Sequence, residues 1–98
     1  MRVRWSSLAL RRAADIVDYI ARDRPRSALD WIDGLHERLD TLTRLPEQGL
    51  TVPEWQDSSL RQITFGDYRV IYRIGDEWID IMTIKHGRQQ LHPPEREF

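Results

Sequence analysis

Cationic side chains gather in the segment YRVIYRIGDEWIDIMTIKHGRQ, in the last third of the sequence. Arg69 and Arg73 are four positions apart, so they share one face of any strand that contains both. The following strand runs out into Lys85 and His86, with Arg88 close behind. Arginine suits bidentate contacts to carboxylates, phosphates and bases. These five residues are candidates for the working groups of a nuclease, for a face that docks another macromolecule, or for ordinary surface charge.

Other chemistries leave no comparable trace in the sequence. The chain has no cysteine, which removes disulfides, thiolate nucleophiles and thiolate metal ligands. His36, His86 and His92 show no i,i+4 pairing and no ligand cluster, so we expect no metal site. No phosphate-cradling glycine loop occurs, and no set of carboxylates or nucleophiles stands out. We therefore expect no cofactor and discount an ordinary metabolic enzyme.

Hydrophobic spacing predicts the elements that position the cationic segment. Apolar residues recur at helical spacing in two stretches separated by DRP, whose proline suits the start of the second helix. After a loop over residues 46–59 the period changes to two, and turns at GD and GDE separate three strands. The expected elements are a strand at Arg2–Trp5, helices at Leu8–Arg22 and Pro25–Leu45, and strands at Leu60–Phe65, Tyr68–Ile74 and Trp78–Lys85.

This order, β-α-α-β-β-β, predicts an α+β fold. Two helices joined by so short a turn should form an antiparallel hairpin that lies on one face of a mainly antiparallel sheet. A short N-terminal strand precedes the hairpin, and a three-stranded antiparallel β-meander follows it. Ninety-eight residues, 40% of them hydrophobic, suit a single domain over residues 1–98 with one modest core.

The net charge and the hydropathy of the sequence limit which partners and which cellular compartment we expect. The net charge is −1 at pH 7, so the field of the whole molecule gives no reason to expect strong nonspecific DNA binding. No stretch is long or apolar enough to cross a membrane, and Arg11, Arg12 and Asp15 interrupt any signal-peptide core. These features predict a cytoplasmic protein with no membrane partner.

Side-chain alternation assigns the cations to one face of the sheet. In the strand Tyr68–Ile74, one face should meet the helices and carries Tyr68, Val70, Tyr72 and Ile74. The other face carries Arg69, Ile71 and Arg73. The register between strands is left open, so Arg61, His86 and Arg88 can converge with Arg69 but need not. We interpret the cluster as a functional surface that the helices leave uncovered. The alternative is that each arginine pairs with a carboxylate across the strands, the candidates being Glu77, Asp80 and Asp67.

Four tryptophans are many for so small a domain. Trp5 and Trp78 are expected in the core. Trp31, on the shoulder of the second helix, and Trp55, in the loop, are candidates for apolar surface that a partner covers. The alternative for Trp55 is packing beneath its own loop.

The layout and four sequence pieces together resemble one protein family. The pieces are WSSLALRRAADIVDYIA, P..A..WI..L...L..L...P..G, YRVIYRI and IKHGRQ. In their order and spacing they resemble the RelE/ParE superfamily of toxins from bacterial type II toxin–antitoxin modules, over essentially the whole chain. YRVIYR followed by HGRQ looks most like the ParE branch.

A RelE-like member would be a ribosome-dependent mRNA endoribonuclease. Such a site makes the RNA 2′-OH attack the neighbouring phosphate, which requires a base, an acid and cations for the crowded phosphate. The resemblance carries Arg69 onto the arginine of the family's YR motif and Arg88 onto a later arginine. Arg61 and His86 would complete a reduced nuclease site.

The sequence departs from that nuclease pattern. The strand LRQITF has Gln62 and Thr64 where lysines are expected, and no tyrosine follows Tyr72. The ParE branch, by resemblance, is not a nuclease: it poisons DNA gyrase, traps the enzyme with cleaved DNA and so blocks replication. We favour this branch, in which the toxin is no enzyme and arginines dock a protein. The candidates for binding the target or a partner are Arg61, Arg69, Arg73, Lys85, His86, Arg88, Trp31 and Trp55.

Both branches imply a cognate antitoxin whose disordered C-terminal segment folds over the toxin. The antitoxin segment could bind in two ways. It could add a strand to an exposed sheet edge, or lie as a helix in a groove beside the helical hairpin. The second partner is DNA gyrase, or in the RelE reading the ribosome and its mRNA, and operator DNA is contacted only indirectly, through the antitoxin. A further alternative is an interaction module that keeps the fold without toxicity.

Overall fold

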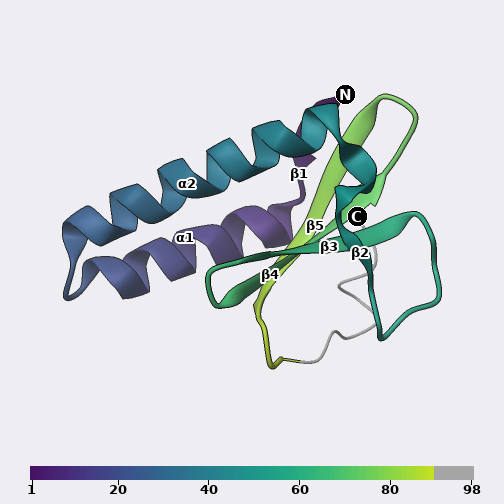
Figure 1. The fold of residues 1–98 in the computed structure, drawn as a ribbon. Helices are drawn as coiled ribbons and strands as arrows, with labels where there is room; N and C mark the ends of the chain where they lie inside the picture. The colour runs from purple at the N-terminus through teal and green to yellow at the C-terminus, as the bar shows by residue number, and fades with distance from the viewer. Residues whose placement is uncertain (90–98) are drawn as a thin grey trace.

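The computed structural model describes residues 1–89 of the chain (Figure 1). Its elements are β1 (Arg2–Trp5), α1 (Ser7–Ala21), α2 (Pro25–Arg44), the 3₁₀ helix η1 (Pro46–Gln48), β2 (Leu50–Thr51), β3 (Leu60–Phe65), β4 (Tyr68–Ile74) and β5 (Trp78–His86). The predicted α+β class and element order are confirmed, while η1 and β2 lie in the segment expected to be loop. His92, one of the three histidines for which no metal site was expected, lies outside the described residues.

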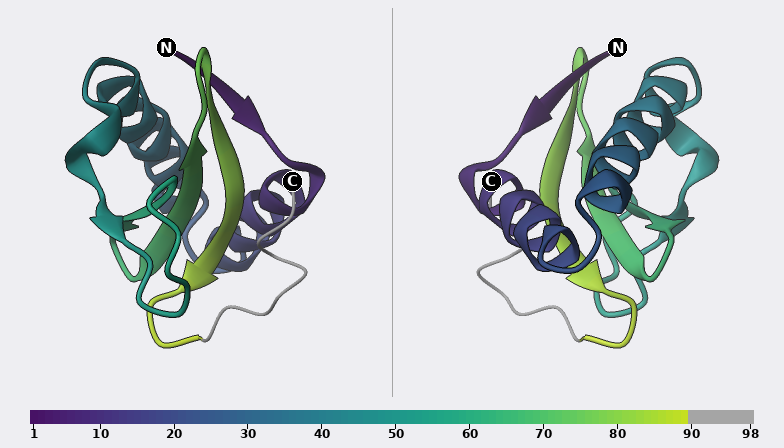
Figure 2. Two further views of the ribbon diagram at one scale, coloured as in Figure 1. Left: turned by 90° about the vertical axis from the view of Figure 1, so that its right-hand side faces the viewer. Right: turned by 90° about the vertical axis from the view of Figure 1, so that its left-hand side faces the viewer.

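The five strands form one sheet in the order β1-β5-β4-β3-β2. β3, β4 and β5 form the predicted antiparallel meander. β1 pairs in parallel with β5, with Arg2 opposite Trp78 and Trp5 opposite Ile81, and β2 adds a short antiparallel pair outside β3. Both helices lie on one side of this sheet, as the sequence predicts (Figure 2).

A serine cap ties the start of α1 to the sheet. Ser6 Oγ accepts a hydrogen bond from the backbone N–H of Ala9 at 3.0 Å, the usual role of an N-cap serine. The same hydroxyl donates to the carbonyl of Met82 at 2.7 Å, and the N–H of Ser6 donates to the carbonyl of Ile81 at 3.0 Å. The entry into the helical hairpin is therefore fixed against β5.

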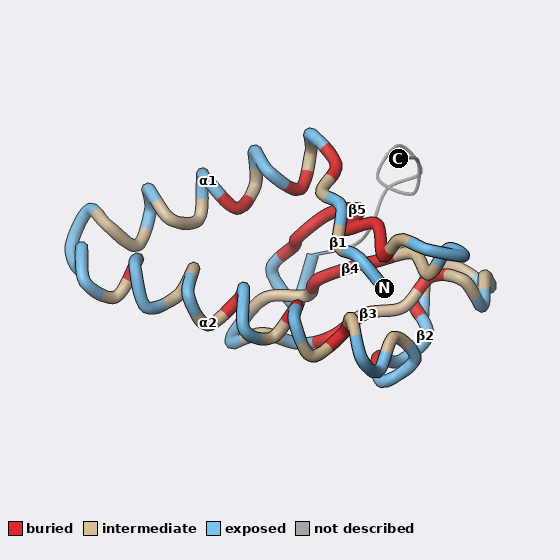
Figure 3. The backbone as a smooth tube through the Cα atoms, turned by 90° about the horizontal axis from the view of Figure 1, so that it is seen from above, coloured by how far each residue is buried: buried red, intermediate tan, exposed pale blue. Residues whose placement is uncertain are grey.

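The main core lies between the helices and the sheet. β4 contributes Val70 and Tyr72, both fully buried, and Tyr68 and Ile74 pack at the margin, so the predicted helix-facing side of β4 is confirmed. Burial concentrates where the helices lie over the strands, while the far end of the helical hairpin is exposed (Figure 3). Neither helix in the described part of the chain is long and apolar enough to span a bilayer.

The opposite face of the sheet was expected to be open. In the structure, part of this face is buried. Leu60, Ile71 and Met82 form a second, smaller core with Val52, each at most 2% exposed. Trp55 packs against this second core. The expectation failed because apolar residues alternate with the cations on this face, and the segment between β2 and β3 supplies partners that bury them.

The ring of Tyr72 is fully buried and its hydroxyl joins the sheet to η1. The hydroxyl donates to the carbonyl of Pro46 at 2.7 Å and accepts from the N–H of Gly49 at 3.0 Å. A Cβ at residue 49 would collide with this hydroxyl, which explains the glycine. Burial raises the pKa of Tyr72 above its ordinary value of 10.0, and the hydrogen bond from Gly49 partly opposes the rise.

Candidate functional site

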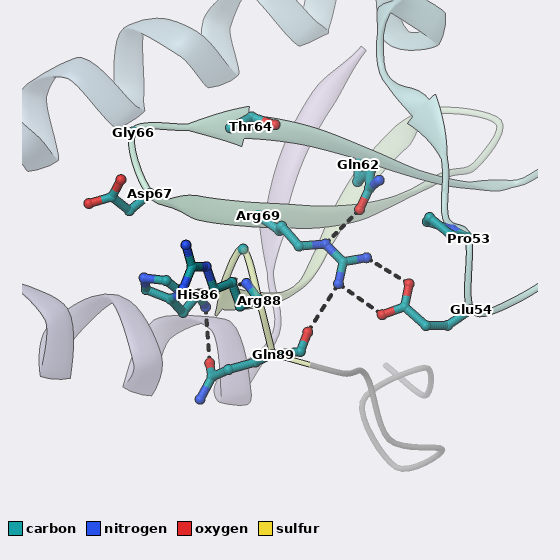
Figure 4. A pocket seen from close by; sticks show the side chains of 11 residues that line it. Pro53, Glu54, Gln62, Thr64, Gly66, Asp67, Arg69, His86, Arg88 and Gln89 are labelled. Atoms are coloured by element: carbon teal, nitrogen blue, oxygen red, sulfur yellow. Dashed lines mark hydrogen bonds and ion pairs between the residues drawn. The ribbon is translucent and has the colours of Figure 1, made fainter.

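A polar hollow of about 840 Å³ opens on the sheet face away from the helices (Figure 4). Its lining residues are Pro53 and Glu54 from the loop before β3, Gln62 and Thr64 from β3, Gly66 and Asp67 from the β3–β4 turn, Arg69 from β4, and His86, Gly87, Arg88 and Gln89 at and after the end of β5. The hollow therefore brings together Arg69, His86 and Arg88, three of the residues that the sequence analysis singled out.

Two turns hold the rim of this hollow together. Gly66 has a φ of +58°, a left-handed conformation that favours glycine, and it closes the turn that sets Thr64 opposite Arg69. The N–H of Gly87 donates to the carbonyl of Asp67 at 2.8 Å. The segment after β5 is thereby held beside the β3–β4 turn.

Arg69 is the most constrained side chain of the hollow. Its Nη1 and Nη2 each donate to one carboxylate oxygen of Glu54, both at 2.8 Å. Its Nε donates to Oε1 of Gln62 at 2.8 Å, and Nη1 also donates to the carbonyl of Gln89 at 3.1 Å. The side chains of Arg69 and Glu54 are only 12% and 16% exposed. A bidentate pair so sheltered from water is among the stronger ion pairs, and it fixes the plane of the guanidinium.

His86 and Arg88 differ from Arg69 in being exposed at the rim. The His86 ring stands edge-on to Tyr68, with centroids 5.9 Å apart. The backbone N–H of Arg88 donates to His86 Nδ1 at 3.4 Å, which leaves Nε2 as the nitrogen able to face a partner. The rim therefore presents one imidazole and one guanidinium to an incoming group.

Arg61 does not join the hollow. It lies on the helix-facing side of the sheet, opposite Tyr72. Its Nη1 donates to the carbonyl of Gly49 at 3.3 Å, on the side of the sheet where the Tyr72 hydroxyl lies. The sequence left open whether Arg61 converges with Arg69, and the structure shows that it does not. Thr64 is the partner of Arg69, and residues on one strand separated by an odd number of positions point to opposite faces.

Arg73 and Lys85 share the face of Arg69 but lie outside the hollow. Arg73 is opposite Asp80, at the other end of β4, with Ile71 of the second core in between. Lys85 is directly opposite Arg69 in the strand register, yet it is 8% exposed and lines a separate hollow beside α1. Of the predicted docking residues, Lys85 therefore offers little surface to a partner.

Asp80, one of the carboxylates named in the alternative of cross-strand ion pairs, pairs with an arginine of β1. Asp80 accepts from Nε of Arg4 at 2.6 Å, between β5 and β1, and this hydrogen bond raises the pKa of Arg4. Arg2 and Arg4 also lie over the ring of Trp78, at 5.6 and 4.9 Å from its centroid. Trp78, which was expected in the core, is thus a half-buried platform for arginines, while Trp5 packs against the main core as expected.

Trp31 and Trp55 both have partners within the chain. Trp31 meets the rings of Phe65 and Tyr68 edge-on, with centroids 5.7 Å apart in each case. Its Nε1 is buried and has no hydrogen-bond partner among residues 1–89. Trp55 packs on the second core, which agrees with the alternative that it lies beneath its own loop.

The carboxylate of Glu54 is the functional group that sequence reasoning missed. It lies in an irregular segment, where no periodicity predicts which way a side chain points. The position of Gln62 could have been predicted, because side-chain alternation in LRQITF puts it on the same face as Thr64. Among residues 1–89, no cluster of three or more His, Asp or Glu side chains is placed to hold a metal ion.

Fold and site together define a class: a small α+β protein with a helical hairpin over one sheet face and a charged hollow on the other. The sequence model of the family described as "ParE toxin of type II toxin-antitoxin system, parDE" matches residues 3–91. The chain is 32% identical over 91 residues to "Putative toxin Y4kP" of Sinorhizobium fredii (strain NBRC 101917 / NGR234), which covers 91% of both chains. The structure described as "Chromosomal ParDE TA system from P. aeruginosa" matches with a TM-score of 0.72 at 21% identity, over 88% of this chain and 95% of that chain.

The chain belongs to the ParE toxin family of type II toxin–antitoxin systems. This confirms the superfamily and the branch that the sequence pieces resemble. At 21% identity, the likeness to the solved structure shows the fold alone. Membership of a toxin–antitoxin family implies an antitoxin partner.

Proposed function

We propose that this toxin binds and poisons DNA gyrase, blocking replication, and that it catalyses no reaction itself. The observation that supports the proposal is the bidentate pair between Arg69 and Glu54. A phosphate-cleaving site needs such a guanidinium for the charge that develops on the phosphate, whereas here a carboxylate of the same chain occupies it. Held in this way, Arg69 is part of a rigid protein surface.

The other groups around the hollow also favour docking over catalysis. Cleavage of RNA through its 2′-OH needs a base and an acid beside the phosphate. In the described lining, His86 is the one imidazole, and Gln62 and Thr64 stand where nuclease members have lysines. Tyr72 is fully buried on the helix-facing side of the sheet, and burial raises its pKa. Its hydroxyl therefore supplies neither the base nor the acid that cleavage needs.

The surface left for the protein target is the rim formed by His86 and Arg88, beside Thr64 and Asp67. These four residues are polar and exposed, as the rim of a protein interface usually is. Arginine is enriched among the residues that dominate binding energy there. We therefore propose that the target binds at this rim.

Neutralisation by the antitoxin is the second part of the proposal. The helical hairpin exposes Leu10, Tyr19 and Leu29, at 55%, 68% and 64%. Apolar side chains on an accessible helix surface suit a partner segment that folds as it binds. Operator DNA is then reached only through the antitoxin.

The test uses the purified toxin freed of its antitoxin. It should inhibit gyrase supercoiling and accumulate linear DNA, and mRNA on translating ribosomes should stay intact. His86→Ala combined with Arg88→Ala should weaken inhibition about tenfold, because losing an interface hot spot costs more than about 1 kcal/mol. Glu47→Ala, on η1 and outside the hollow, should inhibit like the wild type.

Convergence of Arg69, His86 and Arg88 in one hollow favours a second candidate, the ribosome-dependent mRNA endoribonuclease. It would be identified by codon-phased cuts in mRNA on programmed ribosomes, with gyrase unaffected. Arg69→Ala and His86→Ala should then abolish cutting. Absence of growth arrest on expression without the antitoxin would identify an interaction module instead.

A further inference from the structure

Glu54 binds Arg69 in the way an anionic ligand would. Both carboxylate oxygens accept hydrogen bonds, at 2.8 Å, from the two terminal nitrogens of the guanidinium. Arginine binds phosphates through the same pair of parallel N–H···O bonds. The carboxylate therefore stands where two oxygens of a phosphate ester would lie on this guanidinium.

The loop that carries Glu54 is held in place by other contacts. Val52 is 2% exposed in the second core, and Trp55 packs on the same core. The N–H of Trp55 donates to the carbonyl of Val52 at 3.2 Å. Asp57 Oδ1 accepts from the N–H and the hydroxyl of Ser59, at 3.0 and 2.7 Å. Because these contacts fix the chain on both sides of Glu54, anchoring the loop does not explain the carboxylate over the guanidinium.

The rest of the hollow offers a phosphate further donors. The side chains of Arg88 and His86 are exposed at its rim, and Thr64 adds a hydroxyl. Arg69 also donates from Nε to Gln62, a hydrogen bond that does not involve Glu54, so we expect the guanidinium to stay in position when Glu54 is replaced. Among the described lining residues of the wild-type chain, however, two carboxylates offset the two guanidiniums (Figure 4).

We propose that Glu54 is a specificity-determining residue, which fills a latent phosphate-ester site centred on Arg69 and so keeps nucleic acid out of the hollow. A phosphodiester would have to displace the Glu54 carboxylate from the guanidinium and bring its own negative charge close to that carboxylate, an arrangement that selects against that ligand. The inference goes beyond the inhibition of gyrase and does not depend on it, because the site and the residue that fills it belong to the isolated chain.

The experiment replaces Glu54 by glutamine, which removes the charge and keeps the size of the side chain. Binding of a fluorescent oligouridylate is followed by anisotropy over a series of salt concentrations. Glu54→Gln should bind at least tenfold more tightly than the wild type at low salt. Its plot of log Kd against log salt should be steeper by about 0.7, the value for one more phosphate contact on a single strand.

Two smaller probes identify what the hollow holds. Inorganic phosphate and uridine 3′-phosphate are each titrated into the isotope-labelled Glu54→Gln protein while the Nε–H resonance of Arg69 is observed by NMR. A shift with both probes assigns the site to the phosphate group. A shift with the nucleotide alone assigns it to a phosphate ester together with its nucleoside.

Glu47→Gln is the matched control, because it makes the same change of charge on η1, outside the hollow. It should bind the oligouridylate as weakly as the wild type, and adding Arg69→Gln to Glu54→Gln should remove the gain. Equal gains for the Glu47 and Glu54 variants, or no gain for Glu54→Gln, would overturn the proposal.

Circular dichroism shows whether each variant is folded, and Glu54→Ala replaces Glu54→Gln if glutamine disturbs the loop. Supercoiling assays on the same proteins report on gyrase separately. Loss of the phosphate site and failure of gyrase inhibition are therefore distinguishable outcomes.

Discussion

The two faces of the sheet differ in what holds them together. On the helix-facing side, eleven buried residues from both helices and three strands form the main core. On the other side, the second core has four buried apolar residues, and charged side chains flank them. Each strand contributes side chains to both faces of the sheet, because successive side chains point to opposite sides. The contrast indicates that the fold depends mainly on one face, which leaves the other free to carry the charges of the candidate site.

The largest effect should come from the main core. Leu35 of α2 is fully buried, so Leu35→Ala should lower the free energy of unfolding by about 2–5 kcal/mol, through lost burial and the cavity left behind. Leu29 lies on the same helix but is 64% exposed, and Leu29→Ala should cost less than about 0.5 kcal/mol. Urea denaturation of both variants measures the difference. Similar losses would contradict the division of the helix into a core side and an outer side.

Tyr72→Phe should have the next largest effect. It removes the hydroxyl that pairs with the carbonyl of Pro46 and the N–H of Gly49. Leaving those backbone groups unsatisfied should cost about 1–3 kcal/mol, measured by the same denaturation experiment. An unchanged midpoint would show that water takes over both bonds.

The same variant tests a pH dependence. Burial raises the pKa of Tyr72 and of Tyr68 in the folded state, so above about pH 10 the unfolded chain loses protons that the folded chain keeps. The free energy of unfolding should therefore hold steady below that pH and fall as the pH rises through the folded-state pKa values. Tyr72→Phe should make this alkaline decline shallower, and an equally steep decline would exclude Tyr72 as its source.

The smallest effect should come from the other face. Val52→Ala removes two methyl groups from the second core, at about 0.8 kcal/mol each, so it should cost about 1–2 kcal/mol. Hydrogen exchange should show the loss in the segment 52–59, with the amides of α1 and α2 still protected. Equal loss of protection in the helices would show that the two cores unfold as one unit.

Short-range patterns predict most of the fold. The apolar stripes of the helices and the alternation of β4 depend on residues a few positions apart, and both appear in the structure as expected. The face of the sheet on which Arg61 lies could also have been predicted from the sequence. A two-residue turn at Gly66 and Asp67 fixes the hairpin register and sets Arg61 opposite Tyr72, a residue already assigned to the helix side.

The remaining features depend on contacts that no local pattern encodes. Glu54 reaches Arg69 because an irregular loop folds back over the sheet, and its course follows from the burial of Val52 and Trp55. The register of β5 shifts between Ile71 and Tyr72, which places Thr83 opposite Ile71 and leaves Met82 without a partner on β4. No turn residue marks that irregularity, so the positions of the residues after β5 could not be counted from the hairpin.

The parallel pairing of β1 with β5 determines when the sheet can be completed during synthesis of the chain. Arg2–Trp5 has its strand partner in Trp78 to Ile81, and Ser6 has its partner in Met82. A growing polypeptide on the ribosome therefore lacks the edge of the sheet until most of it has been synthesised, and such distant pairings form slowly. The complete sheet, and with it the charged hollow at the end of β5, therefore forms only after that last strand has left the ribosome.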